Sequence, residues 1–286
     1  MRFCKHILSL IIVLLAHKAM AQYPKDTLKF NEAFGSAKKL QGKVHVINVF
    51  ISDDKLGWNT QDKELVLNEQ DYAFRWMQGQ AQVFSNNSDL SFTTTNIGLE
   101  KDVKVDNIYA DKNPKFRYPL SVWALYWAGY RQFDNFYDSV KQVNLADNIL
   151  VMVFAKKVGR SFAQHAYDDN KKNPFFLEGA IVYSDTYWGS GLAIATIAHE
   201  MLHLFGAWDI YFKTSQSPEI EKNAKAIFPN SIMLDNNKKI SGLAIDKMTA
   251  WCVGLTDVYL GWYDFFKPRL DKADYKFVQP RIVEKN

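Results

Sequence analysis

Two histidines and two carboxylic acids lie close together in the segment HEMLHLFGAWD, which begins at His199. The residues before it, 191–198, are apolar and lack proline, so they predict a buried helix that continues to about Phe205. His199 and His203 are four residues apart, and their imidazoles therefore project from one face of that helix, one turn apart. Two imidazoles in this arrangement can bind one metal ion, and Glu200 is placed to accept a proton from a water on that ion.

A third ligand is expected beyond the end of this helix. Gly206 can adopt the left-handed conformation that ends a helix and reverses the chain. Asp209, three residues later, then offers a carboxylate oxygen, which is an acceptable zinc ligand. The sequence thus predicts a Zn²⁺ centre formed by His199, His203 and Asp209, with the fourth position left to water as in catalytic zinc sites. Glu200 is the expected general base of this centre.

The sequence leaves two other interpretations of these residues open. They could be ordinary helix residues, although two imidazoles and a carboxylate on an apolar helix are costly to bury without partners. Alternatively, the third ligand is a downstream glutamate, Glu219 or Glu221, because no histidine follows His203.

The string H-E-x-x-H-x-x-G-x-x-D resembles the metzincin signature, and its aspartate is most similar to the third ligand of the snapalysin type of secreted zinc endopeptidases. The resemblance implies an α+β zincin fold, in which a mixed twisted sheet and the active-site helix are followed by a smaller C-terminal lobe with a methionine turn. Met233 in Ser231-Ile232-Met233 fits that turn, as a packing base for the histidines. Asp235 stands where many metzincins have a tyrosine.

The same resemblance gives a substrate-binding role to the strand predicted just before the zinc helix. In metzincins this strand lies at the sheet edge along the cleft, where its unpaired backbone groups pair with an extended peptide. Here the strand comprises Gly179, Ala180, Ile181, Val182 and Tyr183. Without a ligand it would be an ordinary edge strand.

The first 21 residues have the features of a secretory signal peptide. Arg2 and Lys5 precede the apolar run 7–16, and the small residues before Gln22 suit a cleavage site. The run is too short for a membrane-spanning helix, which needs about 20 apolar residues. Removal of 1–21 takes three of the 35 basic residues and none of the 31 acidic ones, so the net charge falls from +4 to +1. We therefore expect an exported protein, secreted or periplasmic, with no integral membrane segment and no basic surface for nucleic acid.

Residues 22–286 are expected to form a single metallopeptidase domain, because no repeat, low-complexity segment or linker suggests another. Its N-terminal lobe would cover 22–206 and its C-terminal lobe 207–286. Cys252 is the one cysteine beyond the signal, so no internal disulfide is available and a buried, hydrophobic role is expected for it. Nothing in the sequence indicates an oligomeric state.

Strands are predicted where β-branched residues run together, and helices where apolar residues recur at helical spacing. The expected strands cover 44–52, 90–95, 148–155 and 179–184. Besides the zinc helix, the expected helices cover 62–84, 122–143 and 245–254. In the first of these, the apolar positions include Leu65, Tyr72, Trp76 and Val83.

The polar segment 160–174 contains His165 and Asp168. A single histidine among aspartate, asparagine and lysine is typical of a solvated loop. A structural zinc or calcium ion near Asp168 is the weaker alternative, suggested by the ions that several metzincins hold in this region.

Together with the resemblance, these residues predict a secreted zinc-dependent endopeptidase, in which a water activated by Glu200 hydrolyses peptide or protein substrates. A protein of another class also fits the sequence. It would be an exported, non-catalytic protein that uses the same fold to hold a peptide without cutting it.

Overall fold

The computed structural model describes most of the chain between residues 35 and 268. The described ranges are 35–86, 88–105, 120–166, 170–172, 176–185, 193–212 and 216–268. The predicted signal peptide and the candidate ion site at Asp168 lie outside these ranges, so the structure addresses neither. No helix within them is long and apolar enough to cross a membrane.

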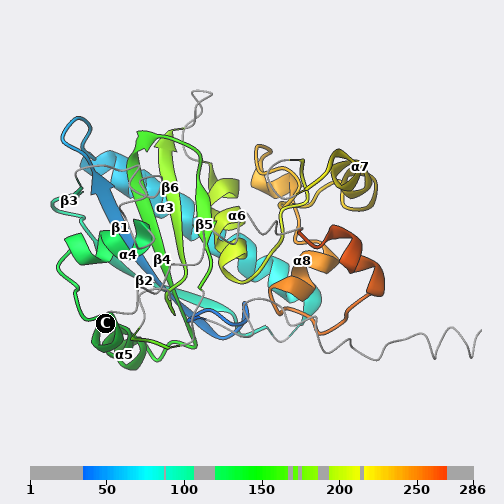
Figure 1. The fold of residues 1–286 in the computed structure, drawn as a ribbon, viewed down its shortest axis with the longest axis horizontal. Coiled ribbons are helices and arrows are strands. Elements are labelled where there is room, and N and C mark those ends of the chain that lie inside the picture. Colours follow the sequence, from blue (N-terminus) through cyan, green and yellow to red (C-terminus); the bar gives the residue numbers. More distant parts are fainter. Residues whose placement is uncertain are drawn as a thin grey trace, which may run out of the picture.

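A mixed six-stranded sheet forms the centre of the N-terminal part of the protein (Figure 1). Its strands are β1 (Lys43–Ser52), β2 (Ser91–Ile97), β3 (Val103–Lys104), β4 (Asn148–Val158), β5 (Phe162–Gln164) and β6 (Gly179–Asp185). They lie in the order β2-β1-β4-β6-β5, with β3 paired to the end of β1. Every pairing is parallel except that of β5 with β6, which is antiparallel. The predicted combination of a mixed sheet with helices is therefore confirmed.

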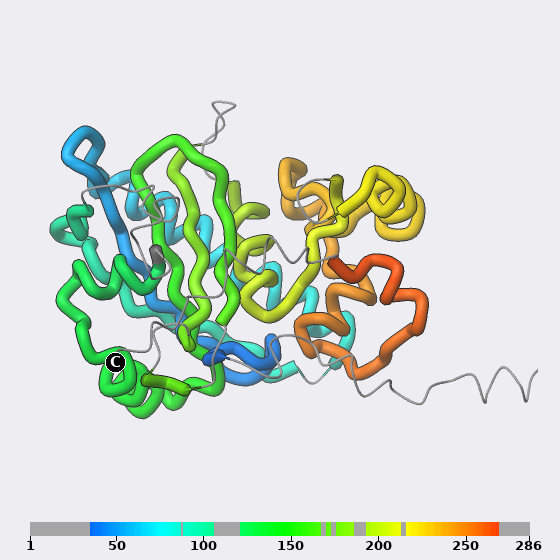
Figure 2. Tube along the Cα trace, viewed as in Figure 1, coloured from blue at the N-terminus to red at the C-terminus, as the bar shows by residue number. Residues whose placement is uncertain are grey.

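Helices cover both faces of this sheet and continue into the C-terminal part. They are α3 (Thr60–Phe84), α4 (Leu120–Trp127), α5 (Phe133–Asn144), α6 (Ile194–Leu204), α7 (Pro218–Ile227) and α8 (Lys247–Cys252), with the 3-10 helices η3 (Ile240–Gly242) and η4 (Gly261–Phe266). In Figure 1, α6 lies between the sheet and the part of the chain that carries α7 and α8. The tube in Figure 2 shows the same arrangement, with the chain after α6 on the side away from the sheet.

Alternating side chains along β1 contribute to two hydrophobic cores, one on each face of the sheet. Val46 and Phe50 belong to a large core shared with α3, α6 and the C-terminal part. Ile47 and Val49 belong to a second core shared with α4 and α5. Because both faces of the sheet are covered, the central strands consist of continuous apolar runs. Such runs are readily predicted as strands from the sequence. Cys252 is buried, as expected for a hydrophobic role.

The helix predicted over 62–84 is present as α3, but three of the four apolar positions named for it do not face the core. Leu65, Tyr72 and Val83 are exposed, whereas Lys63 and Gln70 are among the buried residues of this helix. These two polar side chains are satisfied by partners that lie far away in the sequence. The Lys63 ammonium contacts the Asp102 carboxylate at 2.7 Å and donates to two loop carbonyls, and the Gln70 amide exchanges hydrogen bonds with Asn48 on β1. A pattern that treats every polar residue as exposed therefore assigns the wrong face.

The helix expected over 122–143 is divided into α4 and α5. Gly129 takes a φ of 99°, which is incompatible with a continuous helix, and the amides of Gly129 and Tyr130 close the end of α4. Aromatic residues occur on both sides of the break, so the spacing of apolar residues predicts one continuous helix.

The prediction that Gly179–Tyr183 forms the sheet edge is also wrong. These residues lie in β6, which is paired with β4 on one side and with β5 on the other. The edge strand is β5, which has three residues, all partly exposed. A strand of three residues is too short to show an alternation of apolar and polar side chains. The sequence therefore predicts β6 but not the edge strand β5 beside it.

A buried carboxylate fixes the start of the described chain to the sheet. Oε2 of Glu178 accepts hydrogen bonds from the N–H groups of Ser36 (2.8 Å) and Ala37 (3.0 Å). Oγ of Ser36 lies 2.7 Å from the Ile149 carbonyl and 2.5 Å from Oε2 of Glu178. The single hydroxyl proton of Ser36 can serve only one of these two acceptors, so a proton on Glu178 satisfies the second contact. Consistently, burial raises the pKa of Glu178 from 4.5 to about 8.

We expect Glu178 to make the protein less stable as the pH rises. Since its folded pKa lies above its unfolded value, its contribution is complete below pH 4.5 and is lost as the pH approaches 8. Glu178→Gln should therefore reduce the fall in the free energy of unfolding between pH 5 and pH 8, measured by denaturant titration. Glu64→Gln, at an exposed position of α3, is the matched control. Equal pH dependence in wild type and Glu178→Gln would refute the assignment.

Candidate metal centre

The end of α6 sets the position of Asp209 relative to the two histidines. Gly206 has a φ of 96°, and its N–H donates to the carbonyl of His203 at 2.8 Å. The next N–H, of Ala207, donates to the carbonyl of Leu202 at 3.1 Å. This pair of bonds is a Schellman motif, which favours glycine because a Cβ is strained at positive φ. The predicted chain reversal at Gly206 is confirmed, and it returns Asp209 to the face of the helix that carries the histidines.

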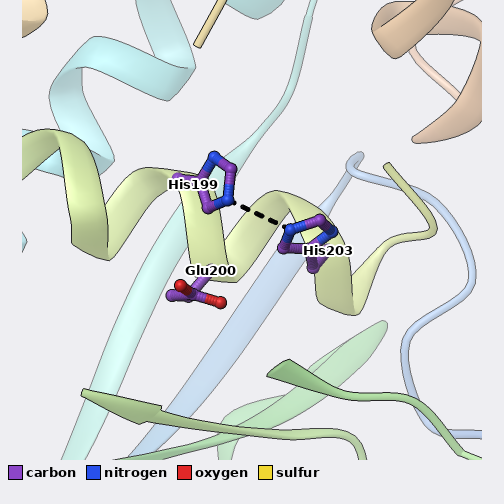
Figure 3. A group of neighbouring side chains, drawn as sticks. All are labelled: His199, Glu200 and His203. Carbon is purple, nitrogen blue, oxygen red and sulfur yellow. Dashed lines mark hydrogen bonds between the residues drawn. The ribbon is translucent and has the colours of Figure 1, made fainter. Parts of the chain in front are cut away.

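Three potential ligand atoms meet at that face. Nε2 of His199 lies 3.1 Å from Nε2 of His203, the contact drawn in Figure 3. Oδ1 of Asp209 lies 3.0 Å from Nε2 of His203 and 3.3 Å from Nε2 of His199. Ligands about 2.0–2.1 Å from a tetrahedral ion are separated from one another by about 3.3–3.4 Å. The three atoms are therefore spaced much as ligands of one ion would be.

Backbone carbonyls determine which nitrogen of each ring carries a proton. Nδ1 of His199 donates to the carbonyl of Ile232 at 3.0 Å, and Nδ1 of His203 donates to the carbonyl of Ala207 at 2.9 Å. In neutral rings both Nε2 atoms then bear lone pairs, which face one another and a carboxylate oxygen. Three lone pairs this close repel unless a cation lies among them. The donor set therefore fits a metal ion, and without one it requires added protons.

The pKa shifts in the absence of metal agree with this requirement. Burial by itself would lower the pKa of His203, but the charge and hydrogen bond of Asp209 outweigh it and raise that pKa to about 9. Burial would likewise raise the pKa of Asp209, but the two histidines hold it well below its usual value. A proton thus stabilises the cluster where a metal would otherwise do so.

Glu200 lies beside the two histidines: the potential ligand atoms of His199, Glu200 and His203 all lie within 4.8 Å of one another. Its Oε2 is buried and has no hydrogen-bond partner among the described residues. Burial raises the pKa of this carboxyl, and the two histidines partly oppose the increase. A buried carboxylate oxygen without a protein partner is suited to accept a proton from a water beside the histidines.

A turn in the C-terminal part holds the first histidine. The N–H of Leu234 donates to the carbonyl of Ser231 at 3.1 Å and closes the turn. Its Ile232 carbonyl is the one that accepts from Nδ1 of His199, and its Met233 carbonyl accepts from the N–H of Ile210 at 3.1 Å. The Met233 side chain is fully buried. The turn thus joins α6 to the chain just after Asp209.

The sequence did not identify Tyr211 and Arg160 as parts of the site. The Tyr211 hydroxyl is hydrogen-bonded to Asp209 and accepts a bond from Nη2 of Arg160 at 2.8 Å. Its ring centroid lies 6.3 Å from that of His199. Burial, followed by the charge of Asp209, raises the pKa of Tyr211, so its hydroxyl remains a donor. The position of Tyr211, two residues after Asp209, is the only signal that sequence offered.

His165 is a second group that the sequence placed incorrectly. Its ring centroid lies 6.4 Å from that of His203, and its Nδ1 is buried, so it is not part of a solvated loop. Burial, followed by the charge of His203, lowers the pKa of His165 to about 4. It therefore presents a neutral imidazole to the site at physiological pH.

The glutamates considered as alternative third ligands lie outside the cluster. Glu219 is exposed on the first turn of α7. The Glu221 carboxylate accepts from the N–H of Phe212 and pairs with Lys225. Oδ1 of Asp209, by contrast, lies 3.0 Å from Nε2 of His203 and 3.3 Å from Nε2 of His199. The structure therefore favours Asp209 as the third ligand.

Comparison with known proteins gives little further information. No protein-family model and no curated protein matches the chain. Among solved structures, it is similar to metalloproteinase-II from Bacteroides fragilis, with a TM-score of 0.35 and 13% sequence identity. The match covers 77% of this chain and 55% of that one, so the chain spans little more than half the length of that protein.

The three-ligand arrangement predicts the zinc content of single variants. His203→Ala and Asp209→Ala should each lose stoichiometric zinc, because two ligands hold the ion far less tightly than three. Glu219→Ala should keep it. Metal content after dialysis against a zinc buffer, measured by atomic absorption, distinguishes these outcomes. Full zinc in Asp209→Ala together with its loss in Glu219→Ala would reverse the assignment of the third ligand.

Zinc binding should also release protons. Since the metal-free His203 has a pKa of about 9, it is protonated at pH 7.5 and must lose that proton to coordinate an ion. We expect release of roughly one proton per zinc at pH 7.5, and weaker zinc binding at pH 6 than at pH 8. A pH indicator in weakly buffered solution measures the release. Uptake of zinc without proton release would show that His203 is neutral before binding.

Proposed function

We propose that the protein is an exported, zinc-dependent endopeptidase of the metzincin type, with residues 22–286 as its catalytic domain. The observation that carries the proposal is the convergence of His199, His203 and Asp209 on one point, beside the unpartnered Oε2 of Glu200. This is the arrangement of a three-ligand catalytic zinc site with a neighbouring general base. The signal-like sequence of the first 21 residues supports the proposed export.

His199, His203 and Asp209 would hold the zinc ion. When bound, zinc polarises the peptide carbonyl and lowers the pKa of a water molecule to about 7. Glu200 would accept a proton at Oε2 from a water molecule that attacks the carbonyl carbon, and would then donate that proton to the nitrogen of the leaving amine. The C–N bond breaks, and the products are a carboxylate and an amine. Tyr211, through its hydrogen bond to Asp209, keeps the third ligand oriented.

The peptide substrate is proposed to add to the edge strand β5. This strand pairs with β6 on one side only, so its other side offers backbone groups for an added strand. Gln164, its last residue, precedes His165, whose ring lies near that of His203. A peptide paired with β5 would therefore pass beside the ligands of α6.

The turn at Ser231–Leu234 corresponds to the methionine turn of metzincins in this proposal. Its buried Met233 lies next to the Ile232 carbonyl that accepts from His199, which suits a packing base for the ligands. Asp235 occupies the position of the tyrosine found in many metzincins, and in this chain Tyr211 brings a phenol to the site from another direction.

Glu200→Gln tests the proposed chemistry. The variant should retain stoichiometric zinc but lose turnover, by at least the roughly 10²–10⁴-fold that a general base contributes. Cleavage of a mixed peptide library by the purified mature protein, analysed by mass spectrometry with and without a zinc chelator, measures the activity. Glu219→Gln serves as a control at an exposed position. Wild-type rates in Glu200→Gln would eliminate this residue as the base, and zinc-loaded wild type that cuts nothing would contradict the peptidase proposal.

A further inference from the structure

Arg160 presents a positive charge beside the candidate metal centre. It is exposed, and its one hydrogen bond within the described part of the chain goes to the neutral hydroxyl of Tyr211. No carboxylate among the described residues lies within ion-pair distance of its guanidinium, whereas Lys156 and Lys157, a few residues earlier, each pair with an aspartate. The charge of Arg160 is therefore available to a ligand that reaches the site.

The backbone around Arg160 is fixed on both sides. The N–H of Gly159 donates to the carbonyl of Asp185 at 3.0 Å, and the N–H of Tyr183 donates to Oγ of Ser161 at 3.3 Å. A Cβ at Gly159 would lie 2.6 Å from the Tyr183 ring, so the chain can approach β6 this closely only with glycine there. The connection between β4 and β5 is thus attached to β6, and Arg160 projects from a supported position.

The guanidinium lies close to the groups that would do the chemistry. Tyr211, which accepts from Arg160, is hydrogen-bonded to Asp209 and has its ring near that of His199. The positive charge of Arg160 also acts on Glu200, whose pKa it lowers slightly against the larger effect of burial. A substrate group that binds Arg160 would therefore lie beside the candidate metal centre.

The direction of β5 indicates which side of the substrate meets Arg160. Antiparallel pairing is the more stable way to add a strand, so a peptide on β5 would run opposite to it. Arg160 precedes Phe162, the first residue of β5. The part of the peptide near Arg160 is then the part that follows the scissile bond.

We propose that Arg160 binds a carboxylate on the C-terminal side of the scissile bond, so that the preferred substrates are acidic there. This inference rests on the peptidase function proposed above and names its substrate class. Two sources supply the same group: the side chain of an aspartate or glutamate, and the α-carboxylate of a peptide that ends shortly after the cut. The planar guanidinium can bind either one with two parallel hydrogen bonds.

The test compares wild type, Arg160→Gln and Arg160→Lys on two versions of one peptide library, with free and with amidated C-termini. Mass spectrometry of wild-type digests should find acidic residues enriched after the cut in both versions, or cuts close to the C-terminus in the free-acid version alone. The first result identifies a side-chain carboxylate and the second an α-carboxylate. Arg131→Gln is the control, since Arg131 is exposed and stacks on Tyr126 of α4, on the opposite face of the sheet.

The expected result is a loss of selectivity. In Arg160→Gln the ratio of kcat/KM for an acidic peptide to that for its neutral counterpart should fall roughly 10- to 100-fold, the range expected for loss of a charge-assisted hydrogen bond. Arg160→Lys should recover part of the ratio, because it restores the charge without the planar fork. Arg131→Gln should leave it unchanged. Equal ratios in wild type and Arg160→Gln would overturn the inference while leaving the peptidase function intact.

A binding measurement keeps this result separate from failure of the proposed chemistry. Fluorescence anisotropy can measure binding of a labelled acidic peptide to the Glu200→Gln variant. Binding should weaken at raised salt, and it should also weaken in the double variant that carries Arg160→Gln as well. An acidic peptide bound no more tightly than its neutral counterpart would overturn the inference whether or not wild type cleaves. Tight, Arg160-dependent binding by a protein that cuts nothing would support the carboxylate site and reject the peptidase.

Discussion

The arrangement of the protein around α6 depends on one electrostatic constraint. Nε2 of His199, Nε2 of His203 and Oδ1 of Asp209 lie within 3.3 Å of one another. The tautomers that direct both imidazole lone pairs into this space are fixed by two backbone carbonyls, so the rings cannot relieve the repulsion by moving a proton from one nitrogen to the other. A metal ion or an added proton therefore stabilises this cluster, and imidazole and carboxylate are donors that a zinc ion accepts.

Much of the surrounding structure serves to bring these three atoms together. The sheet and α3 bury the opposite side of α6. The Schellman motif after α6 turns Asp209 back toward the histidines. The carbonyl of Ala207, in the same motif, orients His203 by accepting a hydrogen bond from its Nδ1. The turn at Ser231–Leu234 supplies the carbonyl that orients His199, and it is itself held by a hydrogen bond from Ser231 to Asp246, the N-cap of α8. The N-terminal and C-terminal parts thus meet through the ligands themselves.

The outer surroundings of the cluster decide what it could act on. Arg160 from the β4–β5 connection forms a hydrogen bond with Tyr211 from the C-terminal part, and the neutral ring of His165 lies near His203. These groups combine a positive charge, a phenolic donor and a neutral imidazole around the carboxylate of Glu200. A positive charge and a hydrogen-bond donor at this place are suited to a ligand that carries a negatively charged group.

The sequence by itself pointed to the candidate metal ligands and to the helix and strands around them. Spacing on one helix identified His199, Glu200 and His203, and a glycine at the helix end pointed to Asp209, because these signals are local and depend only on helical geometry and on the conformation that glycine allows. Continuous apolar runs likewise predicted β1, β4 and β6.

Only the tertiary structure decided where polar groups from distant segments lie. Lys63 is buried because it forms an ion pair with Asp102, and Gln70 is buried because it is hydrogen-bonded to Asn48. Strand β6 is interior because the three-residue β5 pairs with its outer side. Arg160 and His165 reach the site from a segment whose sequence predicts a solvated loop. Each of these outcomes depends on contacts between residues far apart in the chain, and a periodic pattern holds no information about such partners.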